Sequence, residues 1–111
     1  MKQRAELEAL RSLAFGGISG TYAVVGGPFL FPCRLICFTN NTDGDLLFSR
    51  DGVTDELFVA AGSFKLFDVS TNHRHVNQDD LVFVKGTQWY VKESTNPTEG
   101  SVYIETLYAE T

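Results

Sequence analysis

The sequence contains little of what stabilises small extracellular proteins or carries a chain through a bilayer. It has two cysteines, Cys33 and Cys37, and on one expected strand their Cα atoms would lie roughly 13 Å apart, too far for a disulfide. We therefore expect free thiols in a reducing compartment, with an intermolecular bridge as the alternative. No apolar run approaches the ~20 residues of a membrane-spanning helix, and the N-terminus lacks the apolar core of a secretion signal.

Positive charge is also scarce. The chain has 9 Lys and Arg against 14 Asp and Glu, for a net charge of -5, and the cations are scattered along it. Nucleic-acid binding normally needs a basic cluster that replaces counterions at phosphates. We therefore expect no direct nucleic-acid contact and no attachment to a membrane surface.

What the sequence does contain is enough apolar material for one core. It has 111 residues, 43% of them hydrophobic, including nine phenylalanines. This length predicts a single domain. Because each phenylalanine can bury a large apolar area, the composition favours sheets that close on each other or on a partner.

The first segment has the spacing of an amphipathic helix. Leu7, Leu10 and Leu13 recur at three-residue steps, which predicts a helix over about 3–15, with Gly16 and Gly17 as its stop. A helix of ~13 residues is marginal alone in water and needs a surface to lie against. Both its own sheet and a neighbouring subunit fit that need.

Residues 16–32, "GGISGTYAVVGGPFLFP", contain five glycines and two prolines. Such a segment cannot keep a regular strand ladder throughout, so we expect an extended arm. Its apolar side chains either pack on the sheet or dock on another chain. They are Ile18, Tyr22, Val24, Val25, Phe29, Leu30 and Phe31.

From Cys33 onward the pattern is typical of β structure. Short β-branched and aromatic runs alternate with turn residues at close intervals, which predicts an antiparallel β-sandwich or jelly-roll-like domain over residues 33–111. Asp43-Gly44 and Asp51-Gly52 are expected to form tight turns that need positive φ at glycine. The expected strands are 33–39, 46–49, 56–61, 63–69, 81–85, 88–92 and 101–109. The whole chain is thus predicted to be mainly β, with the short helix and extended arm in residues 1–32.

Four acidic residues, Asp43, Asp45, Asp51 and Asp55, fall in these turns. An EF-hand calcium loop starting at Asn41 fails because its sixth residue is Leu46 rather than Gly. The main interpretation is that each Asp caps backbone N–H groups of its turn. A looser calcium site and a hydrolase using Asp51 or Asp55 are the alternatives.

Other chemically active residues lack complete sets. His73 and His75 with Asp79 and Asp80 resemble part of a metal site, but no third ligand at convincing spacing accompanies them, and a polar loop is the main interpretation.

The candidate nucleophiles are equally isolated. Ser49, Ser63 and Ser70 lack a nucleophile elbow, and the cysteines lie in an apolar run that suppresses thiolate formation. The glycine-rich stretches lack the context of a phosphate loop. We expect no enzyme, no cofactor, no resident metal and no catalytic residue.

Three stretches, "RLICFTNNTDGDLLFSRDGVTDELFVAAGSFKLFDVSTN", "FVKGTQWYVKE" and "GSVYIETLYAE", together resemble small structural proteins of tailed bacteriophages. The resemblance runs from Pro32 to the C-terminus and consists of turn and sheet positions. It implies a virion component with a β-sandwich or jelly-roll core and no catalytic residues. It further implies a chain made in the host bacterial cytoplasm and incorporated into the particle.

Compact sandwiches with apolar arms suit repetitive assemblies. We therefore expect a homo-oligomer at the head–tail neck, as a collar, connector or tail-completion ring, in contact with portal, neck, tail or major capsid proteins. A capsid decoration protein is the first alternative, and a carbohydrate-binding module using Trp89 and Tyr90 is the second. The expected contact residues are Leu7, Leu10, Leu13, Phe15, Tyr22, Phe29 and Phe31.

Overall fold

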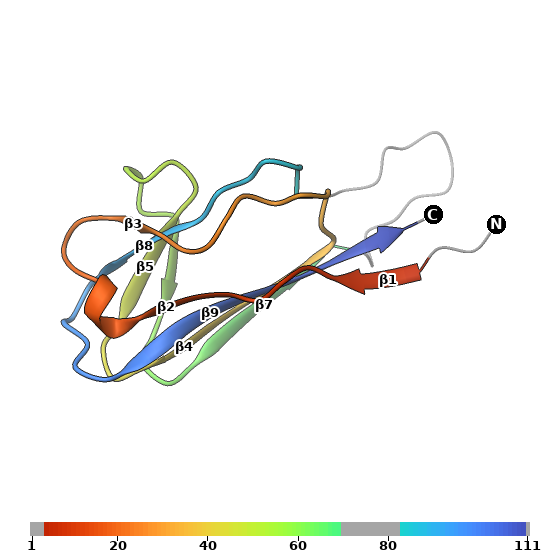
Figure 1. The fold of residues 1–111 in the computed structure, drawn as a ribbon. Helices are drawn as coiled ribbons and strands as arrows, with labels where there is room; N and C mark the ends of the chain where they lie inside the picture. Colours follow the sequence, from red (N-terminus) through yellow and green to blue (C-terminus); the bar gives the residue numbers. More distant parts are fainter. Residues whose placement is uncertain (1–3, 70–82, 111) are drawn as a thin grey trace.

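The computed structural model describes residues 4–69 and 83–110. They form two antiparallel sheets that pack against each other, so the prediction of a mainly β sandwich is confirmed (Figure 1). Sheet A has the strand order β1-β9-β4-β7, with β2 also paired to β9, and sheet B has the order β3-β8-β5-β6. In this part of the chain no helix is long and apolar enough to cross a bilayer.

The strand bounds follow the expected β runs closely from β4 onward. Sheet A comprises β1 (Arg4–Leu7), β2 (Arg11–Ala14), β4 (Leu35–Thr42), β7 (Phe64–Asp68) and β9 (Gly100–Glu110). Sheet B comprises β3 (Ala23–Val24), β5 (Leu46–Ser49), β6 (Leu57–Val59) and β8 (Tyr90–Glu93). Of the expected strand 81–85, residues 81 and 82 lie outside the described residues, and Phe83 forms an isolated bridge with Cys33.

The core lies between the two sheets and is built by alternation along their strands. In β4, Ile36 and Phe38 are buried while their neighbours are only half-buried. The Phe38 ring lies 5.2 Å from that of Phe48 in sheet B and 4.8 Å from that of Trp89, both in edge-to-face contact. Such aromatic contacts add to the stability gained from burial alone.

The turn glycines obey two different constraints. Gly52 has a φ of 76°, as the Asp-Gly turn requires. The same expectation for Gly44 is wrong, because its φ is not positive. A side chain at Gly44 would instead collide with the backbone of Thr95 and Pro97, so the residue is needed for close approach of two chain segments.

The predicted N-terminal helix is not formed: its residues make β1 and β2, and the only helical turn there is the 3-10 helix η1 (Phe15–Gly17). Both strands pair with the long strand β9, as Figure 1 shows. A free helix of that length is marginal in water. Pairing with β9 satisfies the backbone hydrogen bonds and also buries side chains, so the tertiary contact overrides the local periodicity.

A β-bulge separates the two N-terminal strands. Leu7 pairs with Leu107 and Arg11 with Ile104. Three residues of the N-terminal segment (8–10) therefore lie opposite two residues of β9 (105–106). The extra residue reverses the alternation of side chains. Glu8 and Arg11 consequently both point inward, although residues three apart face opposite sides of a regular strand.

These two inward residues make a buried ion pair that holds the N-terminal segment on the sandwich. Arg11 Nη2 lies 2.7 Å from Glu8 Oε1, with side chains 7% and 3% exposed. Arg11 Nε donates to the Gly27 carbonyl at 2.7 Å, and Glu8 Oε2 accepts from the backbone N–H of Leu30 and Phe31 at 3.1 and 3.0 Å. The pair therefore ties β1 and β2 to residues 27–31.

Residues 15–33 cross from sheet A to sheet B and back, and close one side of the sandwich. Ile18, Val25 and Phe29 are buried in the common core. The Arg11 guanidinium lies 5.0 Å from the centre of the Phe29 ring. Several of the arm's apolar side chains thus pack on its own sheets, whereas Val24, Leu30 and Phe31 remain exposed.

We predict that Arg11→Met lowers the free energy of unfolding by about 3–5 kcal/mol, because it leaves the Glu8 carboxylate buried without its cation. Urea denaturation at neutral pH measures the change. The matched control is Arg50→Met, which removes the Arg50 side chain, 59% exposed, from its pair with Glu56 and should cost at most about 1 kcal/mol. Equal losses for the two variants would contradict the role given to the buried pair.

Candidate assembly surface

The outward side of sheet A is unusually apolar. We call it the outer face. In the strand register, Leu7, Leu107 and Leu35 form one row across β1, β9 and β4, and Cys37 with Leu66 and Thr39 with Phe64 continue the face onto β7. Leu7 is 72% exposed, Phe64 64% and Leu66 52%. The apolar side chains of the outer face are Leu7, Leu35, Cys37, Phe64, Leu66, Tyr103 and Leu107.

An antiparallel sheet with one solvated face normally carries polar residues on that face. Here the charged residues are Glu105, which is exposed and pairs in register with Cys37, and Asp68, which is exposed and ends the row of Leu7, Leu107 and Leu35 on β7. At about 4.8 Å between strands and about 3.4 Å per residue, the 32 strand residues of sheet A cover roughly 500 Å². That area is a large part of the ~800 Å² per partner in a typical stable interface. The outer face is therefore a candidate protein-contact surface.

The N-terminal segment adds a second group of exposed apolar residues. Leu10 is 58% exposed, Leu30 65% and Phe31 43%. Phe31 is held in place by stacking on Tyr108, with ring centroids 4.1 Å apart and planes 10° apart. Because Glu8 fixes the backbone at residues 30 and 31, these side chains are presented on an ordered loop.

The structure separates the seven contact residues expected from the sequence. Leu7, Leu10, Phe15 and Phe31 are exposed. Phe29 is only 2% exposed and belongs to the core, so its assignment as a contact residue is wrong.

Two more of the seven are held by the sandwich itself. Leu13 is half-buried and packs on the core opposite Val102. Tyr22 is also half-buried, and its hydroxyl donates to Asp55 at 2.6 Å. Burial next to that carboxylate raises the pKa of Tyr22.

Sequence reasoning missed the contribution of β7. The signal was present in "SFKLFDV": Phe64 and Leu66 lie on one side of the strand and Phe67 on the other, so both sides carry large apolar residues. A strand with only one packed face alternates apolar with polar residues. The pattern therefore indicates a second packed face, and the structure leaves that face open.

The turn carboxylates are occupied by donors of the chain itself. Asp51 accepts hydrogen bonds from the backbone N–H of Thr54 at 2.8 Å and Val53 at 2.9 Å and from the Ser49 hydroxyl at 2.7 Å, and these bonds hold its pKa well below the usual range. The turn-capping interpretation is confirmed for Asp51.

The other three carboxylates bind more distant segments. Asp43 accepts from both the hydroxyl and the backbone N–H of Thr98, which lowers its pKa. Asp45 accepts from Ala61 N–H at 2.9 Å, and Asp55 lies 3.2 Å from Lys92 Nζ. The described residues contain no group of three metal-ligating side chains, and His73, His75, Asp79 and Asp80 lie outside them.

The cysteines are free, as expected, but they do not share a face. Cys33 is buried in the core and Cys37 lies half-buried on the outer face. The expectation of one regular strand is wrong because β4 begins only at Leu35, and Cys33 pairs with Phe83 instead. Burial, reinforced by the nearby Glu8 carboxylate, raises the pKa of the Cys33 thiol to about 11.

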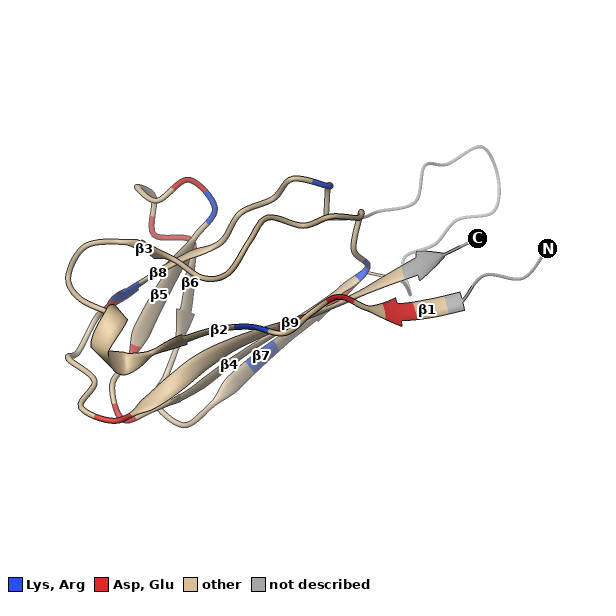
Figure 2. Cartoon of the chain, in the orientation of Figure 1, with Lys and Arg blue, Asp and Glu red and all other residues tan. Residues whose placement is uncertain are grey.

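The structure also shows where the candidate sugar-binding residues and the basic residues lie. Trp89 is only 6% exposed and Tyr90 is half-buried at the start of β8, so the two do not form an open aromatic platform for a sugar. Lysine and arginine residues are spread over separate elements of the described chain (Figure 2).

Comparison with known proteins shows that this chain shares its general fold with a solved structure. No family model matches the chain, and no curated protein matches it in sequence. Among solved structures, a chain of the cyanophage Pam1 capsid asymmetric unit is similar with a TM-score of 0.57 and 15% identity, covering 98% of this chain and 86% of that one. This likeness shows that the two chains have the same general fold.

Two further solved structures are more distant. The Dit hub protein of phage SPP1 has a TM-score of 0.43 and 13% identity, covering 94% of this chain and 49% of that one. A disulfide-linked pilus protein of Bacillus endospore appendages has a TM-score of 0.47 and 11% identity, covering 100% and 93%. With TM-scores below 0.5, neither supports an inference about this chain.

We predict that Asp51→Asn lowers the melting temperature at pH 7 and that the deficit shrinks below about pH 4. The folded pKa of Asp51 is lower than the unfolded value of about 3.9. Its contribution is therefore present above the unfolded pKa and is lost as pH falls through the folded one. Thermal scans at pH 7, 5, 3 and 2 measure the trend.

The control for this prediction is Ser49→Ala, which removes one donor but keeps the carboxylate. It also removes the acceptor of the Asp51 and Gly52 N–H groups, a loss that does not depend on pH, so only the pH-dependent part of its deficit should be smaller than that of Asp51→Asn. A deficit of Asp51→Asn that stays constant from pH 7 to pH 2 would contradict the prediction.

Proposed function

We propose that this chain is a non-enzymatic structural component of a tailed-bacteriophage virion, which assembles through protein–protein contacts. The observation that carries the proposal is the apolar outer face of sheet A, left open on an otherwise well-packed sandwich. Its fold likeness to a chain of a cyanophage capsid supports the same role. The fold alone does not imply a function, so the surface is the main argument.

The outer face supplies the energy that assembly needs. Fully burying a Leu or Phe side chain contributes about 1.5–3 kcal/mol, and Leu7, Phe64 and Leu66 are still between 52% and 72% exposed. Glu105 in the middle of this face favours a partner that brings a cation, since an unpaired buried carboxylate is costly. A partner with an apolar surface and one lysine or arginine fits both features.

The absence of an enzymatic role is part of the proposal. The carboxylates of the described turns are engaged by backbone and hydroxyl donors, which suits a structural purpose. The lowered pKa of Asp43, Asp51 and Asp55 keeps them ionised. A general acid for hydrolysis would need a raised pKa.

Within the particle we propose a homo-oligomer at the head–tail neck, as a collar, connector or tail-completion ring. There the outer face and the N-terminal loop would contact portal, neck or tail proteins. A second placement, on the capsid surface against the major capsid protein, is favoured by the likeness to a capsid chain. In both placements the outer face is the part of the chain that is covered.

Mass spectrometry of purified particles from the phage that encodes the chain tests the virion role. A virion protein should be present at constant stoichiometry, in icosahedral copy number for the capsid surface or as one ring for the neck. Electron cryomicroscopy then locates it. Absence from particles that assemble and infect normally would overturn the proposal.

We predict that the double variant Phe64→Lys with Leu66→Lys is incorporated into particles at least tenfold less than the wild type, because it places two charges on the outer face. Lysines are well tolerated on edge strands such as β7, so the sandwich should stay folded. Particle-bound protein is quantified against total protein, and circular dichroism checks the fold.

Val53→Lys is the matched control, since Val53 is 79% exposed in the turn after β5 and lies away from the outer face. Its incorporation should equal that of the wild type. Undiminished incorporation of the outer-face variant would rule out this face as the assembly surface.

A further inference from the structure

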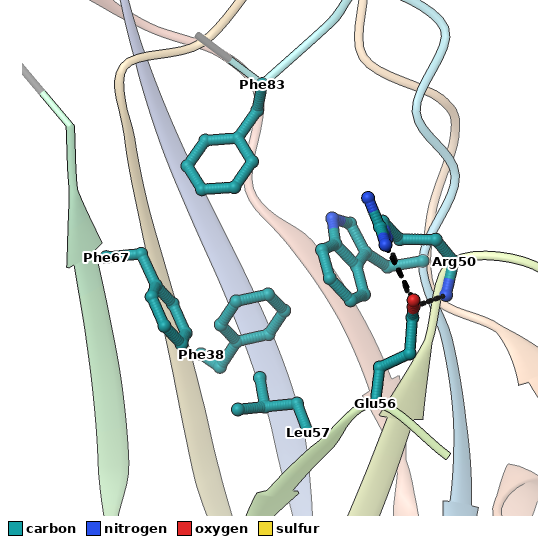
Figure 3. A pocket seen from close by; sticks show the side chains of 7 residues that line it. Phe38, Arg50, Glu56, Leu57, Phe67 and Phe83 are labelled. Atoms are coloured by element: carbon teal, nitrogen blue, oxygen red, sulfur yellow. Dashed lines mark hydrogen bonds and ion pairs between the residues drawn. The ribbon is translucent and has the colours of Figure 1, made fainter. Parts of the chain in front are cut away.

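A pocket of about 390 Å³ opens between the two sheets on the side that the N-terminal segment does not cover (Figure 3). Phe38 of β4 and Phe67 of β7 come from sheet A, and Leu57 of β6 comes from sheet B. The full lining comprises Phe38, Arg50, Glu56, Leu57, Phe67, Phe83 and Trp89. Its size falls within the range of sites that hold small groups, and its walls are mainly aromatic.

Next to this pocket, one buried polar atom has no partner among the described residues. Trp89 Nε1 is buried, and no acceptor for it exists among the described residues. Buried indole N–H groups are usually hydrogen-bonded, and an unsatisfied one is unfavourable. At the rim, Glu56 accepts from the Arg50 backbone N–H at 2.8 Å, from Nε at 3.1 Å and from Nη2 at 2.6 Å, and dashed lines in Figure 3 mark contacts of this pair. A mainly apolar occupant suits this lining, because its charged residues, Arg50 and Glu56, already bind each other.

The pocket lies between two strands that end their sheets. In the described part of the chain, β6 pairs only with β5 and β7 only with β4. Asn40 N–H bonds the Ser63 carbonyl and Val69 N–H bonds the Arg34 carbonyl, so in an antiparallel ladder the backbone groups of Phe64 and Leu66 point away from β4. An extended chain laid along β7 can bond them.

We propose that this pocket is a docking site for an extended segment of another protein. The segment inserts an aromatic or branched aliphatic side chain between Phe67 and Trp89. Its backbone pairs with the free edge of β7. The site is distinct from the outer face and does not require a place in a virion, because it rests on the pocket and the adjacent strand edge alone.

Trp89 is the sole tryptophan of the chain, so its fluorescence reports on the pocket directly. The first probes are N-acetyl-phenylalaninamide and, as polar control, N-acetyl-serinamide. The phenylalanine probe should give a saturable change in Trp89 emission with a Kd on the order of 1 mM, as expected for a ligand of its size. The serine probe should give none at the same concentration.

The backbone contribution is measured with a longer probe, acetyl-Thr-Phe-Thr-amide. It should bind at least tenfold more tightly than the single-residue probe, and N-methylation of its backbone should remove the gain. If the tripeptide binds no more tightly, the occupant is a small molecule and the peptide proposal is overturned.

Two variants assign the binding to the pocket. Phe67→Ala and Phe58→Ala form a matched pair, because both are phenylalanines on edge strands with similar exposure, 38% and 43%, but only Phe67 lines the pocket. We expect at least a tenfold loss of tripeptide affinity for Phe67→Ala and none for Phe58→Ala.

Three results would overturn the proposal. The first is equal affinity of the two alanine variants, and the second is a tripeptide affinity that backbone N-methylation leaves unchanged. The third is a free chain whose Trp89 emission is unresponsive to both probes, since the pocket would then be filled from within the chain. All measurements use the isolated full chain, so their outcome does not depend on whether the chain is incorporated into particles.

Discussion

The pairing of the N-terminal strands with β9 is the contact on which the rest of this structure depends. β9 is the longest strand and is bonded on one side to β4 and on the other to β1 and β2. Because β1 and β2 are fixed there, residues 15–33 can span the gap between the sheets and deliver Ile18, Val25 and Phe29 to the core. The Glu8–Arg11 pair then fastens residues 27–31 over the same side. Without this pairing, one side of the sandwich would lose its cover.

The two sides of the sandwich are therefore unequal. One side is closed by the chain's own first third through apolar packing and a buried ion pair. The other leaves an aromatic pocket beside two strand edges, and the outer face of sheet A adds a third uncovered apolar area. A protein that worked alone would gain solubility from polar residues at these places. The distribution of apolar surface thus favours a chain that is complete only in an assembly.

Sequence patterns identified the parts of the fold whose local and tertiary preferences agree. The alternation in 101–109 indicates a strand and Asp51-Gly52 indicates a turn with positive φ at glycine. Both were predicted, and both are present. The N-terminal residues were not, because the three-residue steps of Leu7, Leu10 and Leu13 indicate a helix, and nothing in the segment itself marks a bulged strand. Only the presence of β9, almost a hundred residues later, decides between the two. Phe29 was misassigned for a related reason, since an apolar residue in a glycine-rich arm carries no local sign of which surface will bury it.

The bulge between β1 and β2 requires a fixed number of residues in this short region. Exchanging one small side chain for another at Ala9 leaves the path of the backbone as it is. Loss or gain of one amino acid between positions 8 and 10 would interchange the two sides of β2, so that a hydroxyl and a methyl group would enter the interior and a guanidinium would emerge into water. Natural variants of this protein should therefore differ here by replacement and hardly ever by an insertion or a deletion.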